Sequence, residues 1–118
     1  MLSEDRDGVV PRGLEEGLAL VRAQRFFTAH EALEQAWRAA SPGERDFFQG
    51  LVHVTVAWYQ ASRGNRPGCE RQLAKALRRL EPFRPAHRGV DVDSVLRQVE
   101  AAAATVASGS LTLPPLRV

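Results

Sequence analysis

Apolar residues recur every three to four positions along this chain, which is the spacing of one face of an α-helix. No stretch alternates apolar and polar residues over the length of a strand, so β-structure is not indicated. The pattern predicts helices over residues 13–24, 28–40, 42–63, 67–81 and 91–107. We therefore expect an all-α fold, a compact bundle of about five helices.

Residues that start and stop helices support these boundaries. Thr28 and Glu31 form a capping box of the type S/T-x-x-E, and residues 41–44 form a second one with proline at the first helical position. The Gly-Asn pair at 64–65 predicts a helix end. Pro82 predicts another, because proline cannot continue a helix.

Short turns between the predicted helices favour antiparallel packing of neighbours. A shift of forty residues aligns Leu33 with Leu73 and Trp37 with Leu77, a faint repeat that resembles tetratricopeptide-type helical hairpins. Two copies are too few for a solenoid. The pattern therefore predicts a closed bundle of antiparallel helical hairpins with tetratricopeptide-like local packing.

The predicted organisation has three parts. Residues 1–11 form a flexible N-terminus, residues 12–107 a single helical-bundle domain, and residues 108–118 an extended C-terminal tail. Because the tail contains two adjacent prolines, it is not expected to be helical, and it either docks on the bundle or stays in solvent.

Composition places the chain among globular proteins, since 44% of its 118 residues are hydrophobic and 25% are charged. The N-terminus has no apolar run of the kind that marks a secretory signal. No apolar stretch approaches the roughly 18 residues of a membrane helix. One cysteine, Cys69, excludes an internal disulfide and fits a reducing cytosol. We expect a cytoplasmic protein without membrane contact.

The net charge of +2 conceals a basic segment over residues 63–88, where eight basic residues stand against two acidic ones. Arg71, Arg78 and Arg79 form its centre, which we call the basic band. Such a band is either a solvated face or a surface for acidic partners. Only Phe83 offers an aromatic ring inside it, so base stacking and a nucleic-acid partner are not expected.

One predicted helix carries unusual polar residues on its apolar face. His30, Glu34 and Trp37 are spaced i, i+4 and i+7, so they lie on one side of the helix. Buried polar groups are costly unless they are paired. This face therefore holds either a satisfied hydrogen-bond network or a functional site.

Antiparallel packing of the second and third helices predicts which residues face each other, because facing positions have a constant sum. That sum is 83 for His30 with His53 and for Glu34 with Gln49. Helix axes about 8–10 Å apart let such side chains meet. His30, Glu34 and His53 would make a divalent-metal site, for zinc as an example, with an open position for water.

The alternative is a structural network of His30, Glu34 and Gln49. Phe27, Trp37, Gln49 and Tyr59 would line a pocket at this seam, although the aromatic residues are equally explained as core. His87, in a proline-rich loop, is expected to be exposed.

The His-Glu-x-x-Glu motif at 30–34 resembles the zinc-peptidase motif His-Glu-x-x-His, with Glu34 in place of the second histidine. By this resemblance Glu31 would be the catalytic base. The capping box with Thr28 is an alternative explanation for a glutamate at this position.

Three ordered motifs, at residues 26–37, 48–51 and 63–68, resemble the signature of the domain of unknown function 309 family. The resemblance covers about residues 12–107. It implies an all-helical bundle found in bacteria, archaea and plastids, with no established activity. Some members are labelled predicted metal-dependent hydrolases, which would assign roles to His30 and, as catalytic groups, to Glu31 and Glu34.

Two functional hypotheses follow. One is a His/Glu pocket that binds a divalent metal or small polar ligand, with metal-dependent hydrolysis as its chemistry. The other is a non-enzymatic, tetratricopeptide-like interaction module in which the His/Glu cluster is structural. The absence of a nucleophile triad and of a phosphate-binding loop favours a protein that is not an enzyme. Its partner would be a protein, a small molecule or a second copy of the chain.

Overall fold

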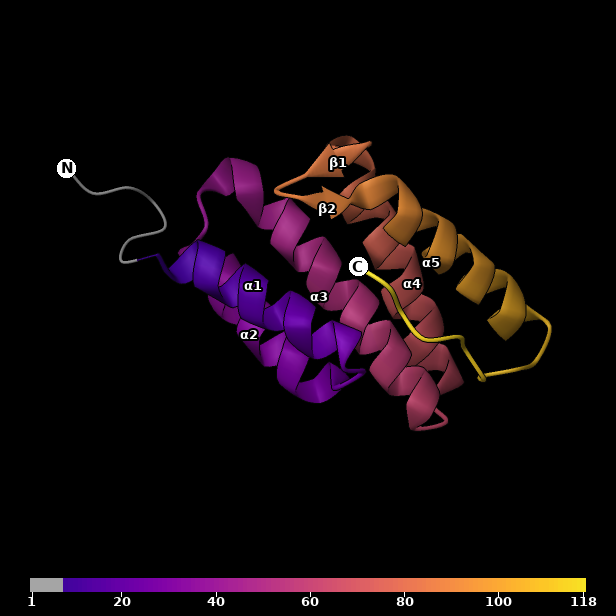
Figure 1. Ribbon diagram of the computed structural model, residues 1–118. Helices are drawn as coiled ribbons and strands as arrows, with labels where there is room; N and C mark the ends of the chain where they lie inside the picture. The colour runs from indigo at the N-terminus through magenta and orange to yellow at the C-terminus, as the bar shows by residue number, and fades with distance from the viewer. Residues whose placement is uncertain (1–7) are drawn as a thin grey trace.

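The computed structural model describes residues 8–118 and shows five α-helices packed against each other (Figure 1). A short 3-10 helix, η1, and a two-stranded antiparallel sheet connect the last two. The all-α prediction is confirmed. The elements are α1 (Val9–Arg22), α2 (Phe26–Ala39), α3 (Pro42–Ser62), α4 (Arg66–Leu80), η1 (Glu81–Phe83), β1 (Ala86–His87), β2 (Val90–Asp91) and α5 (Val92–Ala107).

Helix α3 is the centre of the bundle. Helix α2 packs on one side of it and α4 on another, while α1 packs on α2 and α5 on α4. The 21 residues of α3 include buried side chains all around the helix, among them Phe47, Phe48, Val54 and Trp58. A helix that is apolar on most sides belongs in the core.

Glycines bring the helices close together at two seams. A Cβ added to Gly17 on α1 would lie 2.6 Å from Leu33 of α2. One added to Gly50 on α3 would lie 2.6 Å from Leu80 of α4. Both leucines are buried, so the missing side chain is what lets each pair of helices approach.

Two of the predicted helix starts are wrong. Helix α1 begins at Val9 rather than near residue 13, because Pro11 falls in its first turn, where no N–H is needed. Helix α2 begins at Phe26, with Arg25 as an N-cap that makes no side-chain bond. The predicted Thr28–Glu31 capping box therefore lies inside the helix.

The second predicted capping box is also wrong. Ser41 is the N-cap of α3, as expected, but its side chain makes no capping bond, and Glu44 binds another part of the molecule.

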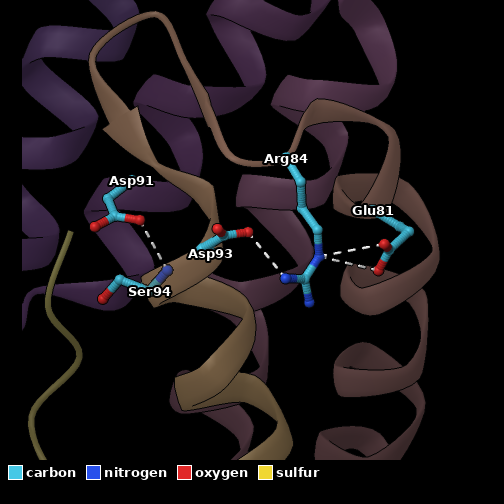
Figure 2. A network of polar contacts seen from close by, with 5 residues as sticks. All are labelled: Glu81, Arg84, Asp91, Asp93 and Ser94. Atoms are coloured by element: carbon cyan, nitrogen blue, oxygen red, sulfur yellow. Dashed lines mark hydrogen bonds and ion pairs between the residues drawn. The ribbon is translucent and has the colours of Figure 1, made fainter.

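Two other side chains cap helices. Asn65 Oδ1 accepts from the N–H of Gly68 at 3.0 Å at the start of α4. Asp91 Oδ1 accepts from the N–H of Ser94 at 2.9 Å at the start of α5 (Figure 2). Both are of the Asn/Asp type that satisfies an orphan amide in the first turn.

An ion-pair network fixes the connection between η1 and α5. Arg84 lies between two acidic side chains, with Nε 3.2 Å from Glu81 and Nη1 2.9 Å from Asp93 (Figure 2). Burial lowers the pKa of Arg84, but the two carboxylates outweigh it and raise the pKa overall. The guanidinium thus stays charged and ties the start of α5 to the end of η1.

The two-stranded sheet was not predicted. Its turn is made by Arg88 and Gly89, which both have positive φ, 48° and 78°. That conformation matches the right-handed twist of a tight hairpin. Each strand has only two residues, too few for a periodic pattern in the sequence.

The tail, residues 108–118, lies against the bundle. Leu116 is only 2% exposed, and Trp58 Nε1 donates to the carbonyl of Pro114 at 2.8 Å. In Figure 1 this stretch, drawn in yellow, crosses from the end of α5 over α3. Of the predicted flexible N-terminus, residues 1–7 lie outside the described part of the chain. Within residues 8–118, no helix is long and apolar enough to cross a membrane.

Candidate functional site on helix α2

The face of α2 that carries the His-Glu motif lies at the surface. His30 and Glu34 are one turn apart, and their side chains are 20% and 33% exposed. His30 Nε2 lies 3.9 Å from Glu34 Oε1, and Arg38 Nη2 lies 3.7 Å from the same oxygen. We call these three side chains the α2 ladder. The Glu34–Arg38 pair at this spacing contributes about 0.2–0.5 kcal/mol, and the His30–Glu34 contact is an ion pair only when the ring is protonated.

The backbone fixes the ring of His30. Its Nδ1 lies 2.5 Å from the carbonyl oxygen of Phe27. Because a carbonyl can only accept, Nδ1 carries the proton and donates it to this bond. In the neutral ring, Nε2 then keeps its lone pair and is the nitrogen nearest Glu34.

Aromatic side chains border the α2 ladder. The ring of Phe27 lies 5.0 Å from that of His30 and 5.6 Å from that of Tyr59, which comes from α3. The guanidinium of Arg63 lies 5.8 Å from the centre of the Tyr59 ring. Phe27 is 52% exposed, and within residues 8–118 it is the only exposed large hydrophobic residue. Phe27, Tyr59 and Arg63 with the α2 ladder form what we call the α2 face.

His53 faces α4 instead of α2. It is 9% exposed, and its Nδ1 donates to Gln72 Oε1 at 2.7 Å. Burial lowers the pKa of His53; the bond to Gln72 opposes this, and nearby positive charges, first that of Lys75, lower it further. Its buried Nε2 has no hydrogen-bond partner among the described residues. The ring is therefore held neutral.

The expected meeting of His30 and Glu34 with Gln49 and His53 is thus corrected by the structure. His53 binds α4, while His30 and Glu34 lie at the surface of α2 and Gln49 is half-buried. Within residues 8–118, no three His, Cys, Asp or Glu side chains stand close enough together to hold a metal ion. Equal sums of position numbers do not identify facing residues here, because α3 packs against both α2 and α4 and its residues divide between these two helices.

The other predicted site residues do not gather into one site. Glu31 is exposed on α2. Trp37 is partly buried and packs against the core, as Tyr59 packs on Phe27. In the basic band, Arg79 Nη1 pairs with Asp46 at 2.7 Å, while Arg71 and Arg78 are exposed. Part of the predicted positive surface is therefore neutralised by α3.

A polar cluster that the sequence did not predict lies at the other end of α3. His87 Nε2 and Arg88 Nε lie 2.9 and 2.6 Å from Glu44 Oε1. The ring of His87 packs 4.7 Å from that of Phe47 and 4.9 Å from that of Phe83. His87, expected to be exposed, therefore docks the β-hairpin on α3.

Burial raises the pKa of the Glu44 carboxyl, but the bonds from Arg88 and His87 outweigh burial and leave the pKa below its usual value. The Ser41–Glu44 spacing pointed to a helix cap. Only the position of the hairpin shows that Glu44 binds two side chains from β1 and its turn.

These features define a small helical-bundle protein with an aromatic and charged face on its second helix. The chain belongs to the family described as Domain of unknown function (DUF309), which matches it over residues 14–72. That region includes α2, α3 and both His30 and His53.

The chain is also similar to the uncharacterized protein YpuF of Bacillus subtilis strain 168. The two are 33% identical over 67 residues, which cover 56% of this chain and 37% of the Bacillus protein. The match thus spans well under half of that relative's length. No solved structure is significantly similar to the chain.

Proposed function

We propose that this protein is a non-enzymatic interaction module that binds a protein partner through the α2 face. The exposure of Phe27 carries the proposal. A phenylalanine that stays 52% exposed beside a second aromatic ring buries only part of its apolar surface in the monomer and so contributes little to its stability. Aromatic residues and arginine are the side chains most enriched at binding hot spots. Phe27, Tyr59 and Arg63 supply both kinds within one contact group.

The composition of the α2 face suggests the chemistry of its partner. Phe27 needs an apolar pocket. Arg38, whose side chain is 64% exposed, and Arg63 would meet acidic side chains at the rim. Glu34 would stay paired with Arg38 and keep the ladder in place. The expected partner is therefore a protein surface with an apolar pocket and an acidic rim.

Site-directed photo-crosslinking tests this proposal. A photoreactive phenylalanine replaces Phe27 in one variant and Arg97, exposed on α5, in a control variant; both are expressed in the source cells. We expect a crosslinked protein at position 27 that is absent at position 97. The partner is then purified and its affinity for Phe27→Ala and Arg97→Ala measured.

The proposal requires Phe27→Ala to weaken binding by at least tenfold, as for a hot-spot residue, and Arg97→Ala to leave it unchanged. Identical crosslinks at the two positions, or full affinity of Phe27→Ala, would contradict it.

A second candidate is a divalent-cation site, favoured by the bond between His30 Nδ1 and the Phe27 carbonyl. A metal-ligating histidine usually donates its other N–H to such an oxygen. His30 Nε2 and Glu34 would supply two ligands, fewer than the three or four protein ligands of ordinary zinc sites. The remaining ligands would have to come from the partner. The hydrolytic roles predicted for Glu31 and Glu34 would depend on a metal held in that completed site.

Calorimetric titration with zinc distinguishes this candidate. Saturable binding that disappears in His30→Ala and persists in His87→Ala would support it. Binding that is the same in both variants, or that is absent even after the crosslinked partner is added, would exclude His30 as a ligand.

A further inference from the structure

The last residues of the chain are held in a groove by side chains from helices α3 and α5 and from the loop between α1 and α2. We call residues 111–118 the tail segment. Its backbone is bound by Gln24, between α1 and α2, by Trp58 on α3 and by Gln98 on α5. No backbone–backbone hydrogen bond joins the tail segment to the rest of residues 8–118. The contact therefore resembles the binding of a peptide more than the addition of a strand.

Two glutamines make paired contacts with single residues of the tail segment. Gln24 donates from Nε2 to the carbonyl of Leu116 at 3.0 Å and accepts from its N–H at 3.1 Å. Gln98 does the same with Arg117, at 2.8 and 2.9 Å. Each amide therefore satisfies both backbone groups of one residue, as a neighbouring strand would. Such contacts recognise an extended backbone and depend little on its side chains.

Four apolar side chains of the tail segment contact the core. Leu116 is the buried anchor, at 2% exposure, and Leu111, Leu113 and Val118 are partly buried, while Pro114, Pro115 and Arg117 are exposed. At Pro114 the groove offers a donor, the Trp58 indole N–H. This contact uses the backbone carbonyl alone, so proline, which has no N–H, is accepted at this position. The groove thus suits a peptide with prolines followed by a leucine.

The tail segment does not fill this groove. A cavity of about 280 Å³ lies on one side of Pro114 and Pro115, toward Gln24 and Ala61. A second, of about 320 Å³, lies on the other side, toward Gln98 and Thr105. Trp58 lines both cavities. A peptide with larger side chains beside its prolines would have room here.

We propose that this groove binds an extended Pro-Pro-Leu peptide from another protein, which exchanges with the tail segment. Proline-containing peptides are already extended and lose little entropy on binding. The exposed stretch around Gly109, whose φ is +102°, is the joint at which the tail segment would leave. Phe27 lines neither cavity, so the groove is separate from the α2 face and does not depend on the proposed function.

Exchange can be measured without weakening any contact. A protease recognition sequence inserted after Gly109 lets the connection be cut in the folded full-length protein. A fluorescein-labelled peptide with the sequence of residues 110–118 is then titrated in, and its anisotropy recorded. We expect saturable binding of one peptide per protein. A peptide in which aspartate replaces Leu116 should bind at least about tenfold more weakly, because it loses the anchor.

Variants of the groove provide the decisive comparison. The double variant Gln24→Ala/Gln98→Ala should weaken peptide binding by at least about tenfold, since it removes four hydrogen bonds. Gln35→Ala, an exposed glutamine on α2, and Phe27→Ala should leave it unchanged. The uncut protein should bind the same peptide more weakly than the cut one, because its own tail segment competes.

Three results would overturn the proposal. The cut protein loses its helical circular dichroism, which would make the tail segment a permanent part of the fold. The labelled peptide binds equally well to the double glutamine variant. The uncut protein forms a dimer that Gln24→Ala/Gln98→Ala abolishes, which would assign the groove to a second copy of the chain.

Discussion

His30 and His53 belong to neighbouring helices, yet their surroundings are opposite. His30 lies at the surface of α2 in a ladder with Glu34 and Arg38. His53 is buried against α4 and bound to Gln72. The α2–α3 seam thus leaves its polar residues at the rim, whereas the α3–α4 seam encloses one. The position of a histidine in a helical pattern does not determine which of two neighbouring helix–helix interfaces its side chain enters.

The difference arises because α3 is enclosed by the bundle and α2 is not. Helix α2 buries mainly small residues and Leu33 along one stripe, so its His30 must lie near the edge of that stripe. Helix α3 buries residues around most of its circumference. Its polar side chains therefore need partners inside the protein, and His53 finds one on α4.

The largest effect should come from closing the space between α3 and α4. Gly50→Ala places a methyl group 2.6 Å from Leu80, which is fully buried. We expect a loss of about 1–3 kcal/mol in the free energy of unfolding. Gly43→Ala, where a Cβ meets nothing within 4 Å, is the control and should gain up to about 1 kcal/mol. Urea unfolding measures both, and equal effects would refute the tight seam.

A smaller loss should follow when the buried histidine is deprived of its partner. Gln72→Ala leaves His53 Nδ1 without its bond, which should cost about 1–2 kcal/mol. Glu34→Gln changes a surface ladder and should stay within about 0.5 kcal/mol. Thermal unfolding of the two variants compares the two seams directly. If Glu34→Gln proves the more destabilising, the α2 ladder is structural after all.

The pH dependence of stability should also distinguish the seams. Because burial holds the pKa of His53 below the usual 6.5, the unfolded chain binds a proton there more readily than the folded one. Stability should therefore be complete above pH 6.5 and fall as the pH drops below it. His53→Gln should flatten this part of the profile, measured by urea unfolding between pH 7 and 5. A profile unchanged by the substitution would place the titrating group elsewhere.

A loss smaller than that of Gln72→Ala is expected at the hairpin. Glu44→Gln weakens the bonds to His87 and Arg88 and should cost about 0.5–1 kcal/mol at neutral pH. Since the folded pKa of Glu44 is lowered from 4.5, the wild-type advantage exists above pH 4.5 and disappears as the pH falls through the lower folded value. The difference in melting temperature between the two proteins should be full at pH 7 and shrink as the pH falls below 4.5.

Much of the fold could be predicted because the sequence marks its helix ends clearly. Pro42, Asn65 and Pro82 each stand within a residue or two of a boundary in the structure. Helices α3 and α4 match their predictions closely for this reason. The start of α2 was misplaced because Thr28 and Glu31 have the spacing of a cap but lie within the helix.

The candidate site could be predicted only in part. The spacing of His30 and Glu34 on one helix is a local property, and the structure has them adjacent. The partner of His53 is not local, because Gln72 lies 19 residues away on a different helix. The groove is less predictable still, since Gln24, Trp58 and Gln98 are far apart in the sequence, share no pattern, and each binds the tail segment only through the tertiary fold.

Cys69 lies on α4 in the hydrophobic core, with no exposed surface. Burial raises the pKa of its thiol, and the charge of Glu70 adds to the effect. A thiol reagent in solution can therefore react with it only when α4 moves away from its neighbours. The rate at which a thiol reagent modifies Cys69 would therefore report how often α4 separates from the core, and the measurement needs no substitution.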